Sequence, residues 1–209
     1  MAGLRKFRAS LIAICALALA LNLAPATSAA LAGQPTDDIK NLIDEVLTIL
    51  KNPTLNIPAQ KSQRLDLIEK AAARRFDYQE MARRSLESHW DKLTKAEQNE
   101  FVNLFTALLK SSYAHRVDEI ANAKVAYESE KITGDTAEVR AVIQRPNDRI
   151  PVDFRLLRRS DGWKICDLVI ENVSLAKNLN HQFGCVIEGS SYKELVRCLR
   201  GKLKEEKGN

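Results

Sequence analysis

Apolar residues change their spacing near residue 123, and this change constrains the fold more than any other feature of the sequence. Before it they recur three and four positions apart, which is the spacing of one helix face. The clearest example comprises Phe101, Leu104, Phe105, Leu108 and Leu109. After it they alternate with polar residues, which is the spacing of a strand. The sequence therefore predicts an α+β protein whose helices and strands occupy separate stretches of the chain.

Four helices are expected before the change of spacing and two after the strands. The expected ranges are 36–51, about 58–75, about 78–89, a helix starting at 94, a helix from 172 or 174 to about 187, and 192–204. The fourth helix has the strongest start signal, because Thr94-Lys95-Ala96-Glu97 is a capping box. The charged tail at 202–209 is expected to fray.

Four strands are expected between these helices, separated by turn residues. The turn sequences are Gly134-Asp135, Pro146-Asn147-Asp148 and Asp161-Gly162. Connections this short join antiparallel neighbours. The fourth strand is apolar on both sides, so we expect cover on both faces. Simple alternation places Trp163, Ile165 and Val169 on one face and Cys166, Leu168 and Ile170 on the other. The predicted architecture is N-terminal helices packed on a curved four-stranded antiparallel sheet and closed by C-terminal helices.

Residues 1–32 have the features of a signal peptide. Arg5, Lys6 and Arg8 precede an apolar run of 14 residues, 11–24. A membrane span needs about 20 apolar residues, so the run fits a signal sequence better than an uncleaved anchor. Small residues allow cleavage after Ala29 or after Ala32. We therefore expect a single exported domain at 33–209, located in the periplasm.

The net charge does not indicate a nucleic-acid partner. The chain has 32 basic and 27 acidic residues, a net charge of +5. Three of the basic residues belong to the signal peptide, which leaves 29 basic against 27 acidic residues. An excess of two charges is too small for a nucleic-acid binding surface.

No motif indicates catalysis or metal binding. The sequence lacks a P-loop, a G-x-G-x-x-G loop, a G-x-S-x-G elbow and an H-E-x-x-H helix. His89, His115 and His181 are scattered over separate helices. After export, three cysteines remain, and Cys185 and Cys198 either form a bridge between two short helices or stay free. We expect no enzyme, no metal and no cofactor.

Two stretches of the sequence resemble the MlaC family of periplasmic phospholipid-transport proteins. The first begins at Phe76 as Phe-Asp-Tyr-x-x-Met-Ala-x-x-x-Leu-x-x-x-Trp and continues through Leu93-Thr94, Phe101, Phe105, Leu108-Leu109 and Tyr113. The second begins at Gly162 as Gly-Trp-Lys-x-x-Asp-Leu-x-Ile-Glu-Asn-Val-Ser-Leu, then Asn178 and Gln182-Phe183. Two residues depart from the family pattern: Asn172 replaces a common Gly, and Cys166 replaces a common Tyr.

The resemblance implies a soluble carrier that holds a phospholipid by its acyl chains in an apolar cavity between helices and sheet. Its partners would be an outer-membrane lipoprotein–porin complex and an inner-membrane ABC transporter with an MCE-domain ring. Together they would maintain outer-membrane lipid asymmetry. The sequence leaves open the headgroup preference, the direction of transport and the docking surfaces.

The candidate lipid-binding residues are apolar side chains expected to face the interior between helices and sheet. Positions that match the family motifs are Phe76, Met81, Phe105, Leu109, Tyr113, Trp163, Val169 and Val173. Strand alternation adds Phe154 and Leu156, and Val142 covers the case in which the other face of its strand is the inner one. Each of these residues could equally build the core, because cores and pockets use the same residue types.

Three other functions remain open at this stage. One is a carrier of a different apolar lipid, such as a hopanoid in the related HpnM branch. Another is a cone-fold isomerase that pairs a buried carboxylate, Asp153 or Asp167, with Tyr127. The third is a periplasmic adaptor without cargo, which a tightly filled interior would support.

Overall fold

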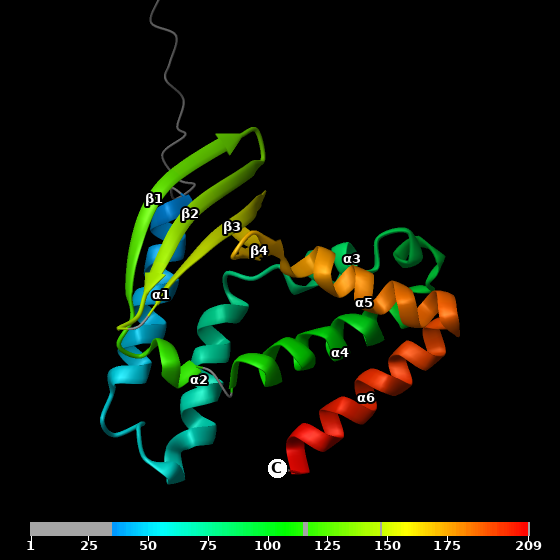
Figure 1. Ribbon diagram of the computed structural model, residues 1–209, viewed down its shortest axis with the longest axis horizontal. Coiled ribbons are helices and arrows are strands. Elements are labelled where there is room, and N and C mark those ends of the chain that lie inside the picture. The colour runs from blue at the N-terminus through cyan, green and yellow to red at the C-terminus, as the bar shows by residue number, and fades with distance from the viewer. Residues whose placement is uncertain (1–34, 115–116, 147, 209) are drawn as a thin grey trace, which may run out of the picture. The chain divides into compact units, whose positions relative to one another are not determined.

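Helices come first, strands next and helices last, as the change in apolar spacing predicts (Figure 1). This computed structural model describes residues 35–114, 117–146 and 148–208. All of them belong to one unit, 33–209. The expected signal peptide at 1–32 and both expected cleavage sites lie outside the described residues.

Six α-helices are present in the described part of the chain. They are α1 (Pro35–Lys51), α2 (Lys61–Ala73), α3 (Tyr78–Leu86), α4 (Lys95–Ala114), α5 (Leu175–Gly189) and α6 (Tyr192–Gly208). Short 3₁₀ helices are η1 (Pro58–Gln60), η2 (Glu87–Lys92) and η3 (Val117–Ile120). None of the helices described is both long and apolar enough to cross a bilayer. The last helix, α6, continues to Gly208 and so includes most of the charged tail that is expected to fray.

The predicted capping box at the start of α4 is confirmed. The Thr94 backbone N–H donates to the Glu97 carboxylate over 2.9 Å, and the Glu97 N–H donates back to the Thr94 hydroxyl over 3.3 Å. These two bonds satisfy backbone donors that a helix start leaves free. The hydrogen bond from the Thr94 N–H lowers the pKa of Glu97.

The sheet is antiparallel, as predicted, but it has five strands rather than four. They are β1 (Lys124–Thr133), β2 (Thr136–Gln144), β3 (Arg149–Arg159), β4 (Gly162–Ile170) and β5 (Val173–Ser174), in that order across the sheet. The extra strand arises from a two-residue turn in which Glu171 has φ +50° and Asn172 φ +67°. Both residues of such a turn need positive φ, which Asn tolerates better than most residues. This explains how Asn172 can replace the Gly that is common in the family.

A β-bulge at Cys166 makes the predicted orientation of the second half of β4 wrong. Leu156 pairs with Ile165, whereas Arg155 pairs with Asp167, so Cys166 is an extra residue on β4. Beyond the bulge, Leu168 pairs with Phe154 and Ile170 with Val152. Paired residues share a face, so Leu168 and Ile170 lie with Trp163 and Ile165, and Val169 lies on the other face. Counting alternate residues along the sequence cannot detect such an inserted residue.

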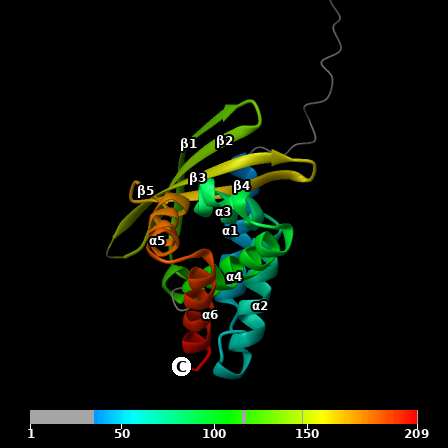
Figure 2. The same cartoon turned by 90° about the vertical axis from the view of Figure 1, so that its right-hand side faces the viewer.

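We name the two faces of the sheet by what packs on them. The α1 face carries Val139, Phe154, Leu156, Trp163 and Ile165, which form one buried cluster with Ile39 and Leu42 of α1. We call this the sheet cluster. The opposite face carries Val142, Asp153, Arg155 and Val169, by strand register. Both faces of β4 are buried, as predicted, because α3 and α5 pack against it (Figure 2).

The helices α3 to α6 form a second core, which we call the helix cluster. Its buried members include Met81, Leu86, Phe101, Phe105, Phe183 and Leu195. Phe76, between α2 and α3, packs against both clusters. The chain on either side of Phe76 bonds to β4: the Ile165 N–H donates to the Arg75 carbonyl over 2.7 Å, and the Asp77 N–H donates to the Ile165 carbonyl over 2.9 Å. These bonds hold Phe76 at the junction of the two cores.

A buried carboxylate fixes α5 to the sheet. The side chain of Asp167 is 3% exposed. It accepts hydrogen bonds from the Ser174 hydroxyl at 2.7 Å, the Ala176 N–H at 3.0 Å and Arg155 Nη1 at 3.2 Å. Ser174 in turn caps α5 by accepting from the Lys177 N–H. A buried charge is tolerated only when it is bonded in this way.

Replacing Asp167 should therefore be strongly destabilising. We expect Asp167→Asn to lower the free energy of unfolding by about 3 kcal/mol, because the buried carboxylate accepts from three groups and an amide can accept through only one oxygen. The matched control is Asp153→Asn, one strand away, whose partner Arg140 is exposed. That change should lower it by less than about 1 kcal/mol. Urea denaturation measures both, and equal losses would contradict this role for Asp167.

Glu87 should be replaceable by glycine with a gain in stability. It is exposed and joins α3 to η2 with φ +44° and ψ −117°, a conformation that side chains disfavour. We expect Glu87→Gly to raise the free energy of unfolding by about 1 kcal/mol, measured by thermal denaturation. Lys70→Gly, inside α2, should lower it by about the same amount. Destabilisation by both substitutions would show that the Glu87 backbone is not strained.

Candidate functional site

The structure brings seven of the predicted lipid-binding residues into the two cores. Phe154, Leu156 and Trp163 belong to the sheet cluster, and Met81, Phe105 and Leu109 belong to the helix cluster. Phe76 contacts both. Most of them are fully buried, while Phe76 and Leu109 are partly buried. The predicted set therefore forms two groups that meet at Phe76 and not a single lining.

The other four predicted residues lie elsewhere or are not described. Val142 and Val169 are buried on the opposite face of the sheet. Val173 is 55% exposed, so the expectation that it faces the interior is wrong. Its strand, β5, is only two residues long and pairs with β4 alone, which leaves Val173 without cover. The side chain of Tyr113, near the end of α4, lies outside the described residues.

An apolar row on the α1 face is the feature that sequence reasoning missed. Strand pairing links Tyr127, Ala141, Val152, Ile170 and Val173 directly across all five strands. The row is buried at Ala141 and Val152, but Ile170 is 40% exposed and Val173 55% exposed. Partly buried apolar side chains flank it at Ile143, Ile150 and Leu168. We call these eight residues the apolar row.

The sequence indicates some residues of the apolar row but hides others. Alternation in the second and third strands indicates Ile143 and Ile150, which share a face with Ala141 and Val152. The bulge at Cys166 hides Leu168 and Ile170, because counting by twos assigns them to the wrong face. The row therefore needs the strand register as well as the sequence.

Tyr127 is the polar member of the row. Its hydroxyl is buried and has no hydrogen-bond partner among the residues that the structure describes. Burial, together with the nearby Asp44 carboxylate, raises the pKa of Tyr127 to about 12. The hydroxyl therefore stays protonated at neutral pH. It is a donor in apolar surroundings.

The acid–tyrosine pair expected for an isomerase is not formed. Tyr127 lies on the α1 face, whereas Asp153 and Asp167 lie on the opposite face of the sheet. Asp153 accepts from Arg140 at 2.9 Å, and Asp167 is bonded to Arg155 and to the start of α5. Asp167 is deeply buried, and its hydrogen bonds give it a structural role that accounts for the burial.

The three cysteines in the described part of the chain are all free. Cys166 is buried, and its thiol donates to the Arg155 carbonyl over 3.3 Å. Burial raises the pKa of Cys166 to about 11, which keeps the thiol protonated and weakly nucleophilic. Cys185 and Cys198 are exposed and free, so the bridge that the sequence left open is not formed in this structure.

Two cavities lie beside α3, and polar or charged side chains contribute to the lining of both. One, of about 300 Å³, includes Arg84, Lys131, Glu138, Arg155 and Cys166 in its lining; we call it the Arg84 cavity. The other, of about 330 Å³, includes Asp77, Arg83, Trp90, Lys95 and Arg159. Both are at the lower end of the size of ligand pockets, and neither is the apolar cavity that the resemblance implies.

Glu80 lines the second cavity and connects it to the first, because it bonds to Arg84. Its carboxylate accepts from Arg83 at 2.7 Å and from Arg84 at 2.8 Å. Burial raises the pKa of Glu80, but the hydrogen bonds from Arg83 and Arg84 outweigh burial, so the pKa is lowered overall. The carboxylate is therefore charged at neutral pH and fixes both arginines from one side.

Comparisons with known proteins agree with this architecture. A solved phospholipid-binding protein from Ralstonia solanacearum, in complex with a phospholipid, superimposes with a TM-score of 0.74 at 23% identity. The match covers 83% of this chain and 99% of that one, which shows that the fold is shared.

Sequence comparison gives the family. The intermembrane phospholipid transport system binding protein MlaC of Haemophilus influenzae is 33% identical over 94 residues. The aligned part spans 42% of this chain and 44% of that relative, less than half of either. The family model described as MlaC protein matches residues 40–201, which is most of the chain. The chain therefore belongs to the MlaC family.

Proposed function

We propose that this protein is a phospholipid carrier that holds its lipid by the acyl chains on the α1 face of the sheet, next to Phe76. The observation that carries the proposal is the apolar row, which runs from the buried core to exposed Ile170 and Val173. Family membership supports it, as do the phospholipid bound by the Ralstonia protein and the phospholipid-transport role of the Haemophilus relative.

A carrier of this kind must replace water around long hydrocarbon chains. Each CH₂ group moved from water to an apolar surface contributes about 0.8 kcal/mol, so one long acyl chain corresponds to roughly 10 kcal/mol. Free phospholipid is consequently very scarce in water. An apolar protein surface that is open at one end removes most of this penalty without any covalent chemistry.

The partly buried residues of both cores are the best candidates for contact with the chains. In the sheet cluster these are Ile143, Ile150 and Leu168, and in the helix cluster Leu109, Leu175 and Leu179. Phe76 packs against both groups. We infer that the acyl chains lie between the two clusters, with their exit at Ile170 and Val173. The headgroup would then stay near solvent.

The family and the features of residues 1–32 support a proposal for location and partners. The features of residues 1–32 support export to the periplasm through a cleaved signal peptide. The Haemophilus relative is part of an intermembrane transport system. We propose the same setting here, with an inner-membrane ABC transporter that carries an MCE-domain ring and an outer-membrane lipoprotein–porin complex as partners. Lipid would pass between the two membranes and maintain outer-membrane asymmetry.

The other functions fit the structure less well. The predicted isomerase would pair Tyr127 with Asp153 or Asp167, but both of these carboxylates lie on the other face of the sheet. An adaptor without cargo does not need the exposed end of the apolar row. A hopanoid carrier would use the same surface, so only identification of the cargo separates it from a phospholipid carrier. We propose neither enzyme activity nor a cofactor.

The first test identifies the cargo. We expect the protein, purified without detergent, to retain a molecule whose mass in native mass spectrometry corresponds to one diacyl phospholipid. Organic extraction should release the same lipid. A triterpenoid mass would favour the hopanoid carrier. A protein that is empty and neither removes nor donates labelled phospholipid between vesicles would contradict the carrier function.

The second test locates the chains. Ile170→Asp should reduce the lipid content and the rate of transfer between vesicles by about tenfold, because it places a charge at the open end of the row. The matched control is Ile57→Asp, since Ile57 is 48% exposed but lies just before η1, in the connection between α1 and α2. It should leave both quantities unchanged. Equal effects of the two variants would place the lipid elsewhere.

A further inference from the structure

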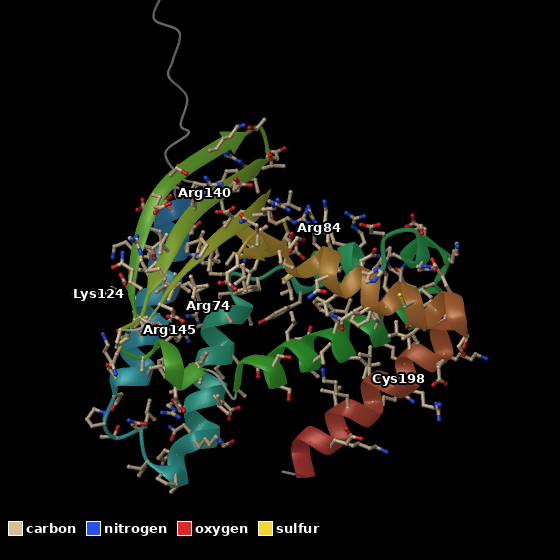
Figure 3. All side chains as sticks on the ribbon, viewed as in Figure 1. Arg74, Arg84, Lys124, Arg140, Arg145 and Cys198 are labelled. Atoms are coloured by element: carbon tan, nitrogen blue, oxygen red, sulfur yellow. The ribbon has the colours of Figure 1, made fainter. Side chains whose placement is uncertain are left out.

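A row of charged residues crosses the opposite face of the sheet. Strand pairing joins Lys131, Glu138, Arg155 and Asp167 directly across β1 to β4. Arg84 approaches this row from α3, on the side next to β4 (Figure 3). Arg84, Lys131 and Arg155 all line the Arg84 cavity, together with Glu138 and Thr133. Three cationic groups from three different elements therefore converge on one space of about 300 Å³.

Both arginines are anchored on one side and have donors to spare. Arg84 donates through Nε to Glu80 at 2.8 Å, and Arg155 donates through Nη1 to Asp167 at 3.2 Å. Neither guanidinium makes a further hydrogen bond within the described part of the chain. Lys131 has no ion pair there. Anchored guanidinium groups lose little freedom when they bind a ligand, which favours recognition of an oxyanion.

Three carboxylates lie near these cations, and only one of them lines the cavity. Glu80 is shared between Arg84 and Arg83, and Arg159 approaches it to 4.0 Å. Asp167 accepts from the Ala176 N–H at the start of α5, where the helix dipole is positive. Glu138 is the one carboxylate that lines the cavity, and its partner is Arg155 at 3.6 Å. The residues that line the cavity therefore carry three cationic groups and one carboxylate.

We propose that the Arg84 cavity binds a phosphate group. Donors that arrive from α3, β1 and β3 suit a tetrahedral oxyanion, whereas a planar carboxylate would use the fork of one arginine. The site lies on the face opposite to the apolar row, so it is separate from the acyl-chain surface. The phosphate would come either from free phosphate or from the headgroup of a membrane lipid against which the protein docks. This inference does not depend on the proposed carrier function.

The test compares two adjacent arginines. Titration calorimetry of the purified protein with inorganic phosphate at low salt should show binding, and Arg84→Gln should weaken it by about tenfold or more, because a charge-assisted hydrogen bond is lost. Arg83→Gln is the matched control, since Arg83 bonds to the same Glu80 but lines the other cavity. It should weaken phosphate binding less than twofold. Circular dichroism establishes that each variant is folded.

A second pair of variants protects the test against misfolding of Arg84→Gln. Lys131→Gln, at an exposed position of β1, should also weaken phosphate binding several-fold, while Lys124→Gln at the start of the same strand should not.

A vesicle experiment distinguishes the two sources of phosphate. Sedimentation with vesicles of phosphatidylglycerol and phosphatidylcholine measures binding to lipid headgroups. Loss of vesicle binding in Arg84→Gln, without measurable binding of inorganic phosphate by the parent protein, assigns the site to headgroups. Binding of inorganic phosphate that depends on Arg84, without vesicle binding, assigns it to free phosphate. Binding of neither probe, or equal losses in Arg84→Gln and Arg83→Gln, overturns the proposal. A phosphate-binding protein that carries no lipid and transfers none between vesicles would refute the carrier function alone.

Discussion

The arrangement of the two cores depends on two backbone hydrogen bonds between β4 and the chain around Phe76. β5 pairs only with the last residues of β4, at Val169 and Ile170, and leaves the rest of that strand edge open. The bonds from Ile165 to Arg75 and from Asp77 to Ile165 cover part of this edge. An open strand edge carries unsatisfied donors and acceptors, so the pairing stabilises the sheet. Because α3 starts directly after it, the same pairing places the helix cluster against β4 and fixes Phe76 between the cores.

The bulge at Cys166 then decides which chemistry each face of the sheet carries. With it, Leu168 and Ile170 join the apolar α1 face, and Asp167 joins the charged row with Arg155 and Lys131. Without the extra residue, the carboxylate of Asp167 would lie in the sheet cluster, far from the start of α5. The proposed acyl-chain surface and the proposed phosphate site consequently use opposite faces of the same strands. One inserted residue separates an apolar function from an ionic one.

Patterns among neighbouring residues predicted most of the fold. They did not predict the features that depend on contacts between distant segments. The capping box at Thr94, the turns at Gly134 and Asp161 and the order of helices and strands depend on neighbouring residues, and all are confirmed. β5 and the bulge at Cys166 depend on pairing with β4 and β3, which no short stretch encodes. For the candidate site, motif matching found Phe76 and the buried aromatic residues. Motif matching missed Ile170 as a site residue, because the pairing of β4 with β3 decides on which face of the sheet Ile170 lies.

Exposure of Ile170 and Val173 is a property that the fold itself imposes. Single exposed apolar side chains are common on protein surfaces and need no explanation. These two differ because they are direct cross-strand partners at the end of a continuous row that is buried at Val152. The turn at Glu171 and Asn172 reverses the chain immediately, and α5 begins after two strand residues, so no further strand residue remains to cover them. A protein that only needed a stable core would gain from extending β5 or from polar residues at these positions. An open apolar end is useful when a hydrocarbon chain has to enter and leave there.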